Sequence, residues 1–149
     1  MPWGDMKTIA LRFGETFAPE GGTIRAHQEM IEQHGFVWYG KLGSPISATA
    51  AKELMESDDP KLLLIHSGGS DRYWLHIKDV QRETPDIDGI PAYYRQQAKD
   101  FGCWFKVTRI EPAKKTVMSE CVVRSSGKTL SLASRHSMSP YFIIEYTGD

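Results

Sequence analysis

The sequence predicts an α+β fold in which about six strands form a single mixed β-barrel with two or three short helices. Two observations predict this class. Helical periodicity is confined to two short stretches within the first 57 residues. From Lys61 onward, runs of apolar and β-branched residues are separated by turn residues. Because 149 residues can bury roughly 68–70% of their unfolded surface in one core, we expect a single domain over residues 1–149.

Two helices are expected before residue 60. The first covers 24–34, where apolar and histidine side chains recur on one face. Thr23 can cap its start and Gly35 can end it. The second covers 48–57, and Ser47 can cap it.

The expected strands are rich in aliphatic, β-branched and aromatic residues. Leu62 to Ile65 form a continuous apolar run, which is typical of a strand buried on both faces. In 72–83 and 103–108 apolar and polar residues alternate, so one set packs inward. Residues 91–100 can form a short helix or an ordered loop. The strand-like runs are 7–14, 36–43, 62–65, 72–83, 103–112, 116–124 and 141–146.

The two cysteines, Cys103 and Cys121, fall on strands that we expect to be neighbours. A turn centred on 112–115 would pair Cys103 near Arg124 and Cys121 near Lys106, so a disulfide is not expected. This agrees with a reducing compartment.

A cytoplasmic location follows from the same kind of evidence. No apolar run approaches the roughly 18 residues that suggest a membrane-spanning helix, and the N-terminus lacks the basic-then-apolar order of a secretory signal. We therefore expect no membrane partner.

The charge distribution indicates modest binding of nucleic acid. The net charge is −1, but residues 101–149 carry 7 Lys and Arg against 4 Asp and Glu, whereas residues 1–100 carry 11 against 15. A small basic surplus predicts few phosphate contacts and a shallow salt dependence. The candidates for contact with the nucleic-acid backbone are Arg95, Lys106 and Arg135.

Aromatic and short polar residues occur side by side in the strand-like runs. Aromatic planes beside hydrogen-bond donors suit a flat polar ligand such as a nucleobase, although the same residues are common packing residues of half-buried strands. We expect a cleft among Trp38, His66, Trp104 and Ser137. The candidates for base binding are Trp38, Tyr39, Lys41, His66, Ser67, Trp104, Ser137 and Ser139.

The order of these pieces resembles the EVE domain group of the PUA-like superfamily, which also includes YTH, ASCH and SRA-like domains. The resemblance covers about 61–145. It lies in an apolar strand that ends in His66-Ser67, a second strand, a Pro-bounded loop, a strand with Trp104 near its start, and a Ser-rich segment from Ser134 to Pro140. Trp38-Tyr39-Gly40-Lys41 stands where such domains have a Trp-Gly stretch, and their N-terminal Ser-x-Pro motif is absent.

The resemblance implies a small β-barrel that accepts a flipped-out, often modified base of DNA or RNA. In a non-catalytic reader of this kind, the base would stack on Trp38 or Trp104, and its edge would be read by His66, Ser67 or the 134–139 segment.

Two alternatives remain open. The chain is also similar in kind to small ASCH-type amidohydrolases, which deacylate a modified nucleoside, and Lys41, Ser44 and Glu83 could supply the lysine, hydroxyl and carboxylate of such an enzyme. The same pocket could instead bind a free nucleotide, as a sensor or a protein-interaction domain.

No metal or cofactor is expected. His27 and His34 are seven residues apart rather than four, and no Cys-x-x-Cys accompanies them. The chain also lacks a phosphate-cradling Gly-x-x-x-x-Gly-Lys loop and a nucleophile elbow. We expect a monomer that binds DNA or RNA carrying a modified base.

Overall fold

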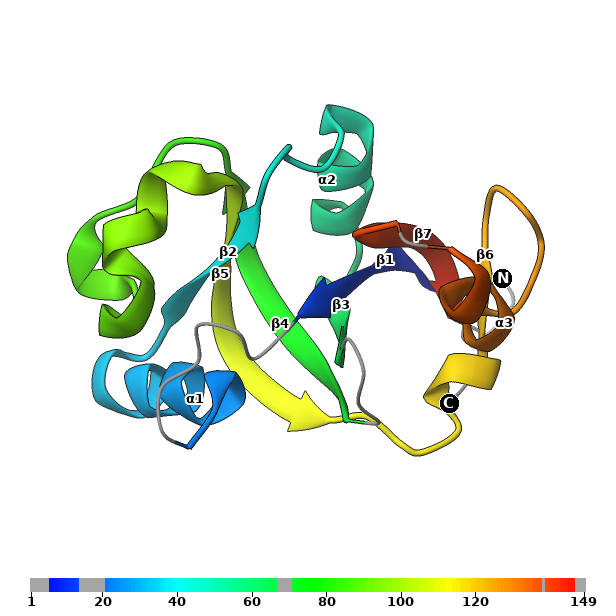
Figure 1. Cartoon of the computed structure of the whole chain (residues 1–149), viewed down its shortest axis with the longest axis horizontal. Coiled ribbons are helices and arrows are strands. Elements are labelled where there is room, and N and C mark those ends of the chain that lie inside the picture. The colour runs from blue at the N-terminus through cyan, green and yellow to red at the C-terminus, as the bar shows by residue number, and fades with distance from the viewer. Residues whose placement is uncertain (1–5, 14–20, 67–70, 138, 147–149) are drawn as a thin grey trace.

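The computed structural model describes residues 6–13, 21–66, 71–137 and 139–146, and it confirms the α+β class. One curled seven-stranded sheet crosses the molecule, and the helices lie around it (Figure 1). The strands are β1 (Met6–Phe13), β2 (Val37–Leu42), β3 (Lys61–His66), β4 (Arg72–Gln81), β5 (Phe101–Pro112), β6 (Cys121–Val123) and β7 (Tyr141–Tyr146).

The sheet is open rather than closed into the expected barrel. Its order is β2-β5-β4-β3-β1-β7-β6, so β2 and β6 are its edges. Only β1 and β3 pair in parallel, and the other neighbours are antiparallel. β2 and β7 lie toward opposite ends of this order and are not paired as strands, but their side chains meet. The ammonium group of Lys41 on β2 lies 5.5 Å from the ring centroid of Tyr141 on β7.

The two expected N-terminal helices are confirmed with small changes at their ends. In the first, Gly22 takes the N-cap position and Thr23 begins the helix, while Gly35 at φ 84° ends it and donates to Ile31 O. In the second, Ser47 Oγ accepts from Ala50 N at 3.1 Å, as expected of a cap. The helices are α1 (Thr23–His34), α2 (Ala48–Met55) and α3 (Leu130–His136), with 3-10 segments η1 (Ile87–Gly89), η2 (Ala92–Asp100) and η3 (Val117–Ser119).

The prediction was wrong in the region after β5. The strand expected over 116–124 is reduced to the three residues of β6, preceded by η3. β6 pairs with β7 rather than with β5, so Cys103 and Cys121 are not on neighbouring strands, and both are free and buried. Part of the expected Ser-rich loop is helix α3, because Thr129 caps it by accepting from Leu132 N.

Both faces of the sheet are covered. The inner face of the curl forms the main core, in which residues of five strands pack with α2. On the outer face, one apolar cluster lies between β1, β3 and β7 and the α3–η3 region. A second cluster lies between β2 and β5 and the segment that contains η1 and η2. Because successive strand residues point to opposite faces, the alternation in each strand decides which cluster a residue joins.

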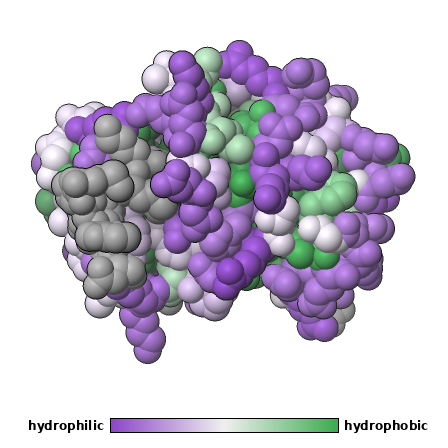
Figure 2. Space-filling view, turned by 180° about the vertical axis from the view of Figure 1, so that it is seen from behind, coloured by the Kyte–Doolittle hydropathy of each residue, from purple (hydrophilic) through white to green (hydrophobic). Residues whose placement is uncertain are grey.

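The face opposite to that of Figure 1 is mostly hydrophilic, and its hydrophobic residues form small, separate groups (Figure 2). Within the described ranges, no helix combines the length and apolar character that crossing a bilayer requires.

His27 on α1 gives the fold a pH dependence that can be measured. Its side chain is 1% exposed, its Nδ1–H donates to Thr23 O at 2.9 Å, and burial lowers its pKa from 6.5 to about 4. Between these two values the unfolded chain binds a proton that the folded protein does not, so stability falls as the pH falls through this window.

We predict that this residue alone removes about 2 kcal/mol from the free energy of unfolding between pH 7.5 and pH 5. Urea unfolding at both pH values measures the loss. The variant His27→Leu should be less stable at pH 7.5 but lose correspondingly less on acidification. An equal loss in the variant and the parent protein would contradict the prediction.

Candidate functional site

Trp38 and Trp104 lie together, but inside the apolar cluster on the outer face of β2 and β5. They are 8% and 0% exposed and pack against Ile90 and Ala98. The segment that contains η1 and η2 covers the two indoles closely, because a Cβ added at Gly89 would lie 2.7 Å from Cδ1 of Trp38. A flat ligand could stack on either indole only after the η1–η2 segment moved away.

Two of the candidates for backbone contact help to hold this cover. The Nε–H of Arg95 donates to Ile90 O at 2.8 Å, and the ammonium group of Lys106 lies 4.6 Å from the ring centroid of Phe36. Each cation therefore has a structural partner, on the same outer face as Trp38 and Trp104.

Tyr39 and Lys41 alternate with Trp38 and point to the inner face. Tyr39 is 8% exposed, and its ring centroid is 5.1 Å from that of His27. Lys41 is 6% exposed, and its Nζ donates to Ser44 O at 2.6 Å and to Leu42 O at 3.3 Å. Burial lowers the pKa of Lys41 below its ordinary value. A buried amine of this kind loses its proton more readily than an exposed lysine.

The other two residues of the amidohydrolase alternative are placed differently. Ser44 meets Lys41 through its backbone carbonyl rather than its hydroxyl. Glu83 is exposed, and its carbonyl accepts from Gln81 Nε2 at 2.8 Å. Among the described residues, no group of three or more His, Cys, Asp or Glu side chains could hold a metal ion.

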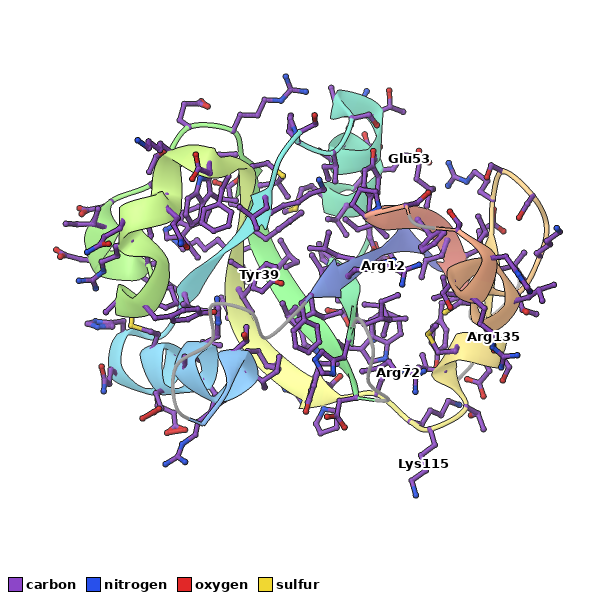
Figure 3. All side chains as sticks on the ribbon, in the orientation of Figure 1. Arg12, Tyr39, Glu53, Arg72, Lys115 and Arg135 are labelled. Carbon is purple, nitrogen blue, oxygen red and sulfur yellow. The ribbon has the colours of Figure 1, made fainter. Side chains whose placement is uncertain are left out.

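A cavity of about 230 Å³, which we call the basic cleft, lies between the ends of β1 and β3, the start of β4, and α3. Among the described residues its lining contains three arginines and no Asp or Glu. Arg12, Arg72 and Arg135 come from β1, β4 and α3, in the right half of the view (Figure 3). The lining residues are Arg12, Ile65, His66, Arg72, Met118, Ser131, Ser134 and Arg135.

Strand register explains why two of these arginines meet. Arg12 on β1 pairs with Ile65 on β3, and Ile65 pairs with Arg72 on β4. Directly paired residues point to the same face, and neighbouring strands are about 4.8 Å apart. The backbones of Arg12 and Arg72 are therefore separated by roughly 10 Å, with Ile65 between them.

Arg12 also holds the segment that follows α3. Its Nε–H donates to Ser139 O at 2.8 Å, and its Nη2 donates to Ser134 O at 2.9 Å and to Ser137 O at 2.7 Å. Its guanidinium carbon is 5.4 Å from the ring centroid of Phe142. The serine segment thus takes its shape from a single arginine of β1.

Of the polar residues expected to bind a base, His66 lines this cleft, whereas Ser137 and Ser139 are not among its lining residues. The ring of His66 stacks on Phe13 with the centroids 4.8 Å apart. Ser67 lies outside the described residues. The hydroxyls of Ser137 and Ser139 bond each other at 2.9 Å, and their carbonyls accept from Arg12.

The structure does not bring all the expected site residues into one place. Along β4, Trp104 is paired with Gln81, whereas Ile65, next to His66, is paired with Arg72. Nine residues of strand separate these positions, which corresponds to roughly 30 Å along the strand. The tryptophans and His66 therefore belong to different regions of the molecule.

Sequence reasoning found His66 and Arg135 but missed Arg12, Arg72 and Ser131. The basic surplus after residue 100 pointed toward Arg135. Arg12 and Arg72 lie in the acidic part of the chain, and only the pairing of β1, β3 and β4 brings them to the cleft.

Comparisons with known proteins give one match. No curated protein and no solved structure matches the chain. A family described as Pua-like matches residues 9–137. This range contains β2 to β6, most of β1 and every described residue that lines the basic cleft, but not β7. The chain belongs to the Pua-like family.

Proposed function

We propose that this protein binds nucleic acid at the basic cleft and accommodates a flipped-out, modified base beside it. Pua-like domains are in general nucleic-acid-binding domains, and they typically bind RNA. The observation that carries the proposal is the lining of the cleft, whose described residues include three arginines and no carboxylate. Arginine recognises phosphate through parallel, charge-assisted hydrogen bonds.

The finer parts of the proposal rest on the resemblance to EVE domains. Under this proposal, residues 1–149 act as one domain and as a monomer in the cytoplasm, without metal or cofactor. The bound strand is DNA or RNA with an altered base. Extrusion of a base costs a few kcal/mol, and least where the base is damaged or already unpaired, so a domain with few phosphate contacts would select such bases.

His66 is the best-placed residue to meet the base. It lines the cleft at the end of β3, where its ring stacks on Phe13 on the face of the sheet opposite to that of Arg12 and Arg72. In this arrangement the base stacks on His66, and the serine segment of Ser137 and Ser139 reads its edge. Stacking on Trp38 or Trp104 is the second arrangement, and it requires the η1–η2 cover to open.

The first test measures binding of single-stranded oligonucleotides over a salt series. Because the cleft offers three arginines, the logarithm of the affinity should fall against the logarithm of the salt concentration with a slope no steeper than about −2. Arg72→Gln and Arg135→Gln should each weaken binding by about tenfold, the effect of losing one charged contact.

Lys115→Gln is the matched control, because it removes the same charge from a side chain that points away from the cleft (Figure 3). It should leave the affinity unchanged. Failure of the parent protein to bind any oligonucleotide would refute the proposal.

The second test separates the two arrangements of the base. Affinities for a panel of oligonucleotides with methylated and plain bases give a preference ratio for each variant. His66→Ala should bring this ratio toward one, whereas Trp104→Phe should leave it unchanged. If Trp104→Phe brings the ratio toward one and His66→Ala does not, the base binds at the tryptophans, beneath the η1–η2 segment.

One observation favours the amidohydrolase as a second candidate, namely the buried amine of Lys41 with its lowered pKa. A neutral lysine can accept a proton from the water that attacks an amide carbon. If the protein is such an enzyme, it should hydrolyse N4-acylated cytidine to cytidine and a carboxylate, and Lys41→Ala should abolish this turnover.

A second variant, Glu83→Gln, tests whether this exposed carboxylate takes part. Loss of activity in both variants would support the Lys41, Ser44 and Glu83 arrangement. Absence of turnover by the parent protein would reject this candidate and leave the binding function in place.

A further inference from the structure

We infer that the basic cleft recognises a phosphomonoester, the terminal phosphate of a strand or a nucleotide, in preference to the internal phosphodiesters of the backbone. The inference rests on the proposed function, since it names the chemical group that enters the cleft. It follows from the charge, geometry and size of the cleft.

The charge of the lining exceeds what one internal phosphate requires. An internal phosphodiester carries a single negative charge, whereas a phosphomonoester carries about −1.5 to −2 at pH 7 and presents three acceptor oxygens. Arg12, Arg72 and Arg135 contribute three positive charges to a single cavity, and the described residues that line it include no Asp or Glu. A dianion therefore balances this cleft better than a monoanion does.

Arg12 is held in position before a ligand binds. Three of its five N–H groups donate to backbone carbonyls of the serine segment. Its two Nη1 hydrogens form no hydrogen bond with the described residues, and Arg12 lines the cleft. A fork of two donors on a fixed guanidinium suits two oxygens of one phosphate, with little side-chain freedom to lose on binding.

The opposite wall supplies donors that can adjust. Arg135 is exposed, and a single long bond of 3.3 Å joins its Nη2 to Ser131 Oγ. Ser134 Oγ donates to Ser131 O, also at 3.3 Å. A phosphate oxygen can replace these weak contacts with shorter, charge-assisted bonds. Arg72, one strand beyond Ile65, faces the same space.

The size of the cleft also favours a chain end. Its volume of about 230 Å³ lies below the roughly 300–1,000 Å³ of pockets for drug-sized ligands. It can hold a phosphate with part of a sugar. An internal phosphate would require the strand to both enter and leave through this space, whereas a terminal phosphate requires one exit only.

The experiment compares short single-stranded oligonucleotides of one sequence that carry a 5′-phosphate, a 3′-phosphate or hydroxyls at both ends. Fluorescence anisotropy gives the affinity of the parent protein for each. We expect one phosphorylated end to bind at least tenfold more tightly than the hydroxyl form. Inorganic phosphate at millimolar concentration should reduce this advantage.

Arg72→Gln and Arg135→Gln should remove the advantage of the phosphorylated end, and Lys115→Gln should retain it. Arg12 is not substituted, because it shapes the serine segment. Thermal unfolding of each variant verifies that it is folded. If both arginine variants are folded and keep the full advantage, the cleft does not hold the phosphate and the inference is overturned.

The remaining outcomes separate this inference from the proposed function. Equal affinity for phosphorylated and hydroxyl ends would overturn the inference and leave nucleic-acid binding intact, whereas no binding to any oligonucleotide would overturn both. A nucleoside monophosphate that binds as tightly as the phosphorylated oligonucleotide, and more tightly than its nucleoside, would support the site and identify a free nucleotide as its source.

Discussion

The structure depends on a sheet whose two faces are both buried. Antiparallel sheets commonly leave one face in water, but here the inner face forms the main core and two apolar clusters cover parts of the outer face. Large aromatic residues are therefore used as packing wherever they occur within the strands. Polar side chains can gather only where the covers end, and the basic cleft lies at such a place, between the ends of β1 and β3 and helix α3.

Local sequence patterns were sufficient to predict most of the helices and strands. The αL glycine at Gly35 and the serine cap at Ser47 act within one turn of the chain, so their signals can be read directly. The region after β5 failed because its structure is decided at a distance. β6 pairs with β7 across more than twenty residues, and α3 is held by Arg12 from β1. A run of serines there has the composition of a loop although half of it is helical.

The candidate site could be predicted only in part, for the same reason. His66 follows an apolar strand and Arg135 lies in a basic stretch, so each has a local signal. Nothing near Arg12 or Arg72 in the sequence indicates a site, since their proximity is created by the parallel pairing of β1 with β3. Trp38 and Trp104 do have a local signal, but it is ambiguous. An aromatic residue beside a polar one occurs both in binding pockets and in apolar cores, and only the position of the η1–η2 segment shows that these two tryptophans are packed in a core.

The central place of β1 has a consequence for biosynthesis. Among the described residues β1 is the first strand and β7 the last, and β1 lies between β3 and β7. While the chain leaves the ribosome, β1 lacks both neighbours until β3 emerges and one of them until β7 emerges, so it exposes an unpaired edge that other chains could extend. The arginine that shapes the cleft is on that same strand, so the cleft takes its final form only after β1 has met both of its neighbours.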